Sequence, residues 1–236
     1  MNLSDQKWAA QASGDAGERS VLKIEAFFDF ICPWCLIGKR NLDSAISRFA
    51  SSRPDVRVSV QWRSHQLLPW TPLDGMPYQA FYRDRLGSAE AVAARRAQVQ
   101  RAGQDAGVEF AFDRIEVLPN TAAAHDLVSL AASRGNGAQV AALIDRLLTA
   151  YFLEGKNIGD CEILERLGLE CGLEHEGLKA HLVATRRLAD PTGQRVAYAD
   201  PQVSGVPYFV FNAGYSLSGV YSPVAIASAM ALAVAG

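Results

Sequence analysis

The feature that most constrains the fold of this chain is an apolar strand pattern that runs into a Cys-Pro-Trp-Cys motif. Residues 21–30, VLKIEAFFDF, are rich in β-branched and aromatic side chains and predict a buried strand. The motif occupies residues 32–35, and apolar side chains recur at helical spacing over residues 36–50. Residues 57–62, RVSVQW, alternate valine with polar residues and predict a second strand. Strand, helix and strand in this order predict a βαβ unit with a parallel strand pair.

The pattern changes after this unit. Residues 68–201 are rich in Ala, Leu, Arg and Glu at helical spacing, broken by Gly, Pro and Asn. Asn120 and Asp160 stand where their side chains could cap helices. We therefore predict an inserted all-helical domain of five or six helices over these residues.

Strand character returns near the C-terminus. Residues 207–211 and 215–220 predict strands, and Asn-Ala-Gly between them predicts a hairpin turn. A final helix is predicted over residues 222–234. The class is α/β, in the order β-α-β, helical insertion, β-β-α, so that residues 21–67 and 202–236 form one domain around the insertion.

The bulk composition excludes some classes. With 236 residues, 49% of them hydrophobic, the chain can bury a core, and a net charge of −2 argues against a nucleic-acid binder. No run reaches the roughly 18 apolar residues of a membrane span. Residues 1–20 lack the basic start and apolar segment of a secretory signal, so we expect a disordered lead-in, no membrane partner and a cytoplasmic location.

The motif itself predicts thiol chemistry if it opens the helix. Cys32 would lie at the helix N-terminus, where unpaired N–H groups and the macrodipole favour a thiolate. Pro33 suits the first helical position, where its missing N–H costs nothing. Cys35, nearly one turn on, would be close enough for a disulfide but more buried. An exposed attacking thiol and a protected resolving thiol are what disulfide exchange requires.

A zinc half-site is the alternative for a close cysteine pair. It needs two more ligands, but Cys161 and Cys171 are separated by nine residues and form no second close pair. We interpret them as structural or incidental thiols. The four histidines show no metal-ligand spacing, so no metal is expected; they are His65, His125, His175 and His181.

A second motif lies at residues 205–209, GVPYF, which in isolation is a plain strand start. Combined with the first motif and the element order, it resembles the DsbA-like branch of the thioredoxin superfamily over about residues 21–234. Within this branch the chain is most similar to the FrnE-type, polyketide-associated dithiol oxidoreductases and isomerases. The segments that carry this similarity are FFDFICPWCLIGKRNL, PNTAAAHDLVSLA, AYFLEGKNIGD and GVPYFVFN.

The resemblance implies a thioredoxin-like fold and a geometry for the site. Pro207 would be cis and lie against the Cys32 sulfur, and Val206 would offer backbone groups to an extended substrate strand. The partners would be disulfide- or thiol-bearing proteins or small molecules. No resident cofactor is implied, and glutathione is the candidate co-substrate.

The chain departs from this family's pattern in two places. Thioredoxin-like proteins often keep a buried acid where this chain has Ala26, so Asp29 becomes the candidate acceptor of the Cys35 proton, with a turn or cap role as its alternative. DsbA has a histidine between its cysteines. Trp34 carries no charge to stabilise a thiolate, which predicts a less oxidising pair.

Three functions are compatible with these residues. One alternative is a glutathione-dependent isomerase or transferase of the hydroxychromene-carboxylate isomerase or kappa-class type, whose members typically have serine at the nucleophile position. The presence of both Cys32 and Cys35 favours disulfide exchange or isomerisation instead. A non-catalytic, chaperone-like binding module is the third.

Two further groups within residues 70–101 are open to interpretation. The arginines are expected on a solvated helix face, and the aromatic residues in the core or along a groove beside the motif. They are Arg83, Arg85, Arg95, Arg96 and Arg101, and Trp70, Tyr78, Phe81 and Tyr82.

Overall fold

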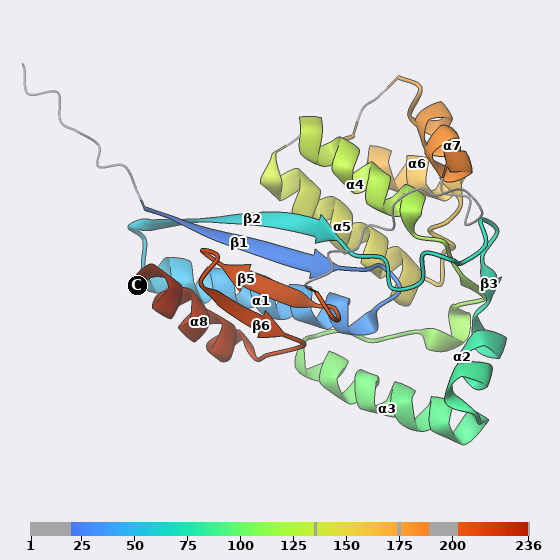
Figure 1. Cartoon of the computed structure of the whole chain (residues 1–236), viewed down its shortest axis with the longest axis horizontal. Helices are drawn as coiled ribbons and strands as arrows, with labels where there is room; N and C mark the ends of the chain where they lie inside the picture. The colour runs from blue at the N-terminus through green and yellow to red at the C-terminus, as the bar shows by residue number, and fades with distance from the viewer. Residues whose placement is uncertain (1–19, 135, 174–175, 189–202, 236) are drawn as a thin grey trace, which may run out of the picture.

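A four-stranded sheet forms the centre of the molecule (Figure 1). The computed structural model describes residues 20–134, 136–173, 176–188 and 203–235. Strand order is β2-β1-β5-β6, with β1 parallel to β2 and both other pairs antiparallel. The strands are β1 (Ser20–Phe28), β2 (Val56–Ser64), β5 (Tyr208–Phe211) and β6 (Tyr215–Ser218). The predicted βαβ unit and terminal hairpin are therefore both present.

Two helices, α1 (Pro33–Ser52) and α8 (Pro223–Ala235), pack side by side on one face of this sheet (Figure 1). Alternate side chains of the strands meet them, as the two-residue period of a strand requires. The buried cluster between sheet and helices includes Leu22, Ile24, Phe209, Phe211, Leu42, Ile226 and Met230. The cluster holds α1 against the sheet, and with it the cysteine motif.

The segment between β2 and β5 is mainly helical, as predicted, and its helices lie to one side of the sheet (Figure 1). The described helices of this segment are α2 (Tyr78–Leu86), α3 (Ala89–Asp105), α4 (Ala122–Arg134), α5 (Gly137–Phe152), α6 (Cys161–Glu170) and α7 (Leu178–Leu188), with a 3-10 turn at Phe112–Arg114. None of the described helices has both the length and the apolar character needed to cross a bilayer.

The prediction of an all-helical insertion is wrong in one detail. β3 (Met76–Pro77) pairs antiparallel with β4 (Val117–Leu118) inside it. Strands of two residues are too short to show an alternating pattern, so the sequence carries no signal for them. Residues 189–202 of the predicted insertion lie outside the described part of the chain, and the division into two domains stays a prediction.

The cap predicted at Asp160 is confirmed, and Asn120 binds the first N–H of α4 although the helix begins one residue later than predicted, at Ala122. The Asn120 side-chain oxygen accepts a hydrogen bond from the Ala122 N–H at 3.0 Å, and Asp160 accepts one from the Glu162 N–H at 2.7 Å. The predicted lead-in over residues 1–20 ends one residue too late, because Ser20 already pairs with Val56 in the sheet. Residues 1–19 lie outside the described structure.

Candidate active site

The cysteine motif opens α1, as predicted. Cys32 is the N-cap residue with extended backbone angles (φ −94°, ψ 109°), and Pro33 begins the helix. No side chain caps this helix end. The Cys32 sulfur therefore lies at a helix N-terminus, where the N–H groups and the macrodipole favour its anionic form.

The second motif lies against the first in space. The Cys32 Sγ–H donates to the Val206 carbonyl oxygen at 3.4 Å, although the two residues are 174 positions apart. The Val206–Pro207 peptide bond is cis, which is the isomer that the family resemblance implies. The structure thus brings the nucleophile and the substrate-binding backbone of the sequence hypothesis together.

Gly38 allows this close approach of α1 to the proline loop. A Cβ atom at Gly38 would lie 2.9 Å from Pro207 Cγ and 3.4 Å from the Phe209 ring. Real Cβ atoms essentially never come within 3.0 Å of another heavy atom, so any side chain here would displace Pro207 or the helix. Glycine at this position therefore permits the geometry of the site.

We expect Gly38→Val to slow the reaction of Cys32 with small disulfides at least tenfold while the far-UV circular dichroism stays close to that of the wild type, because the valine displaces the Pro207 loop at an overpacking cost of about 1–3 kcal/mol. Gly137→Val is the control, since a Cβ there meets nothing within 4 Å. Unchanged reactivity in Gly38→Val would show that the loop contact does not matter for exchange.

The two thiols of the motif differ in environment. Cys35 is 2% exposed. Burial and then the adjacent Cys32 thiol raise the pKa of Cys35 well above its usual value, and the Asp29 carboxylate adds to the effect. The prediction of an exposed attacking thiol is wrong, because Cys32 is itself buried, at 5% exposed. The two thiols differ instead in their surroundings: burial raises the pKa of Cys35, whereas Cys32 lies at the helix N-terminus.

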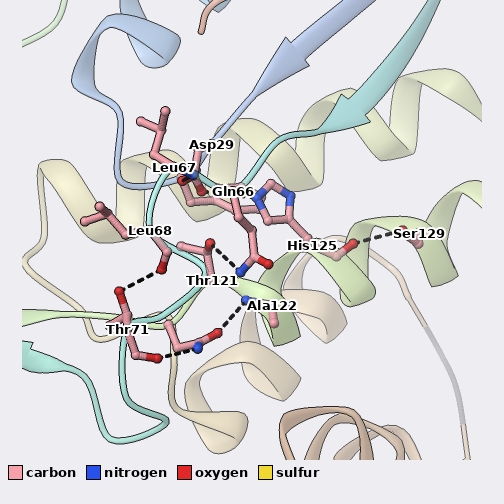
Figure 2. A network of polar contacts seen from close by, with 11 residues as sticks. Asp29, Gln66, Leu67, Leu68, Thr71, Thr121, Ala122, His125 and Ser129 are labelled. Carbon is pink, nitrogen blue, oxygen red and sulfur yellow. Dashed lines mark hydrogen bonds and ion pairs between the residues drawn. The ribbon is translucent and has the colours of Figure 1, made fainter. Parts of the chain in front are cut away.

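Asp29 lies in the loop that links β1 to the motif and is fully buried. Its Oδ1 accepts a hydrogen bond from the Phe30 N–H at 2.7 Å, and its Oδ2 accepts one from the Leu67 N–H at 2.8 Å. His125 Nε2 lies 3.1 Å from Oδ1 (Figure 2). One carboxylate thus joins three segments: the motif loop, the loop after β2, and helix α4.

His125 is the site residue whose partner could not be read from the sequence. It is fully buried, and its ring lies 5.2 Å from the Phe28 ring and 4.8 Å from the Phe30 ring. Its contact with Asp29 joins positions 96 apart in the sequence. The sequence feature that could have indicated a role for His125 is its place in PNTAAAHDLVSLA, one of the segments that carry the family similarity.

A chain of polar contacts fixes the N-terminal end of α4 beside this pair (Figure 2). Gln66 Nε2 donates to Thr121 Oγ1 at 3.2 Å, and Asn120 Nδ2 donates to the Thr71 carbonyl at 2.6 Å. These groups are all buried, and such groups cost free energy unless they are hydrogen-bonded. The network therefore specifies where His125 sits relative to Asp29.

The other two cysteines lie in the helical segment, at the two ends of α6. Cys161 begins α6 and Cys171 caps its other end, so they form no disulfide, and burial raises the pKa of both thiols. Among the residues that the structure describes, no cluster of three or more His, Cys, Asp or Glu could bind a metal ion.

The chain is similar to several known proteins. Residues 23–231 match the family model described as a DSBA-like thioredoxin domain. An uncharacterised Bacillus subtilis protein, YwbO, is 27% identical over 191 residues, which are 80% of this chain and 86% of that protein. The crystal structure of a probable DsbA oxidoreductase from Streptomyces coelicolor is similar, with a TM-score of 0.72 and 26% identity over 91% of this chain and 90% of that one. The cytosolic disulfide reductase DsbM from Pseudomonas aeruginosa, in a structure with GSH, shares the fold with a TM-score of 0.56 and 19% identity over 83% and 89%.

Proposed function

Because this chain belongs to the DSBA-like thioredoxin domain family, we propose that it is a thiol–disulfide oxidoreductase that exchanges disulfides through Cys32 and Cys35. The observation that carries the proposal is the Cys32 sulfur at the N-terminus of α1, 3.4 Å from the Val206 carbonyl, with Cys35 buried behind it. The name of the Streptomyces coelicolor relative supports the same chemistry.

The first step is attack of the Cys32 thiolate on one sulfur of a substrate disulfide. The substrate S–S bond breaks, a Cys32–substrate disulfide forms, and the other substrate sulfur leaves as a thiolate. The backbone groups of Val206 would pair with the substrate strand and hold its sulfur in line. The same intermediate serves isomerisation if a second substrate thiol attacks it.

The second step releases the substrate. Cys35 loses its proton and attacks Cys32 Sγ, so that a Cys32–Cys35 disulfide forms and the second substrate thiolate leaves. The substrate has then gained two electrons and the protein has lost two; the reverse sequence oxidises a dithiol. Because the pKa of Cys35 is raised, this step needs a proton acceptor, and Asp29, whose charge acts on Cys35, is the candidate.

We expect iodoacetamide to alkylate Cys32 first in the reduced protein at pH 7. The thiolate is the reactive form, and raised pKa values keep Cys35, Cys161 and Cys171 protonated there. Peptide mapping by mass spectrometry after short labelling times would rank the four thiols. Faster labelling of Cys161 or Cys171 would contradict the assignment of the nucleophile.

Glutathione is proposed as a co-substrate that resets the motif, and the DsbM structure with GSH motivates the test. Turnover of a protein disulfide should then continue when glutathione is the only reductant. The reduction potential of the Cys32–Cys35 pair would set the direction of net flow. A value near about −270 mV indicates a reductant, and one near about −120 mV an oxidant.

A further inference from the structure

A hollow beside the motif is lined by residues of α2 and α3 and by Pro33, the first residue of α1. Pro33 of the motif forms part of its wall, and aromatic side chains form much of the rest. The space that it encloses is small, about 40 Å³. The aromatic residues are Tyr78, Tyr82 and Phe112.

The charged groups that line this hollow are both cations, Arg95 and Arg96. A neighbouring hollow shares Arg96 and adds Arg83, and no carboxylate is among the described residues that line it. Burial raises the pKa of Tyr78 to about 12, so its phenol stays neutral at ordinary pH. Four of the five arginines are exposed, as predicted, and Arg96 is half-buried. Arg83, Arg95 and Arg96 form a positive surface beside the motif.

Arg96 is held rigidly in this surface. Its guanidinium carbon lies 5.5 Å from the Tyr78 ring centre and 5.7 Å from that of Phe112, and its Nη2 donates to Gln79 Oε1 at 2.6 Å. The nearest acid is Asp113, whose side chain is 99% exposed and 3.4 Å away. Such an exposed partner is a weak competitor for an incoming anion.

Arg95 is exposed and contacts a residue of the motif. Its guanidinium carbon lies 5.9 Å from the centre of the Trp34 ring. Trp34 is one of the two residues between the cysteines of the motif. One of its five N–H donors is directed to Gln98 Oε1, at 2.8 Å between the heavy atoms. A guanidinium in this position can bind a carboxylate on a substrate whose disulfide is at Cys32.

We propose that the surface formed by Arg83, Arg95 and Arg96 binds an acidic side chain next to the cysteine of a polypeptide substrate, and so makes exchange at Cys32 selective for acidic segments. The proposal rests on the proposed function and names its substrate class. Opposite charges that meet across such a surface act mainly on the rate of association, and the effect weakens with salt.

The test uses the full-length protein and two synthetic peptides that each contain one intramolecular disulfide. The peptides differ only in the residues beside one cysteine, which are glutamates in one and lysines in the other. Second-order rate constants for oxidation of the reduced protein are measured by acid quench and mass spectrometry. We expect the glutamate peptide to react about tenfold faster at low salt, and the preference to shrink in 0.5 M NaCl.

Arg95→Glu should remove or reverse this preference, whereas Arg101→Glu is the matched control. Arg101 is an exposed residue of the same helix and lines neither hollow, so its replacement changes the net charge equally. The ratio of the two peptide rates cancels any change in the intrinsic reactivity of Cys32.

Equal rates for the two peptides, or the same change of ratio in Arg95→Glu and Arg101→Glu, would overturn the acidic-substrate proposal while leaving exchange at Cys32 intact. No reaction of the wild type with either peptide would instead reject the proposed function, and this inference with it.

Discussion

Cys32→Ser is expected to lose all disulfide exchange, whereas Cys35→Ser is expected to keep the attack and lose the release. Serine at position 32 has no thiolate to form the mixed disulfide, so turnover should fall to the uncatalysed rate. With Cys35 replaced, the Cys32–substrate disulfide has no internal thiol to resolve it, so it should accumulate. Non-reducing electrophoresis and intact-mass measurement would detect the trapped species.

Cys161→Ser and Cys171→Ser are the matched controls for these variants. Both residues lie at the ends of α6 and are free thiols, so neither replacement should alter exchange. Full multiple-turnover activity in Cys35→Ser without added thiols would show that Cys35 takes no part in release. Residual activity in Cys32→Ser would assign the nucleophile to another cysteine.

Asp29→Ala is expected to destabilise the protein strongly, because each buried N–H group that loses its acceptor costs about 1–3 kcal/mol. The replacement removes the acceptor of the Phe30 and Leu67 N–H groups and the carboxylate that His125 contacts. Urea denaturation would measure the loss. Asp55→Ala is the control, since its pairing with Arg53 is exposed and its removal should change the stability little.

Asp29→Asn separates the structural role of this side chain from its role in proton transfer. Its amide oxygen can still accept a backbone N–H, so more of the fold should survive, but it cannot take a proton from Cys35. We expect release of a preformed mixed disulfide to slow at pH 7 and to approach the wild-type rate as the pH rises toward the raised pKa of Cys35. An equal slowing at every pH would indicate a purely structural role.

Local signals explain what could be predicted from the sequence. Some features depend only on residues that are adjacent in sequence, so they can be predicted without tertiary information. They are the strand before the motif, the proline at the first helical position, and the side-chain contacts of Asn120 and Asp160 at helix starts. The fold class and the two thiols therefore followed from the chain alone. The contact between Val206 and Cys32 could be predicted only from the resemblance to a family, because no local pattern encodes a contact across 174 positions.

Tertiary packing decided the rest. The predicted first strand runs to Phe30, but β1 ends at Phe28, because the Asp29 side chain binds the Phe30 N–H and the loop after β2 instead of continuing the ladder. The buried contact between Asp29 and His125 also depends on packing between distant segments. So does the positive hollow beside Trp34, which α2 and α3 form together. Sequence periodicity shows which face of an element is buried, whereas the partner that satisfies a buried charge is set only when distant elements pack together.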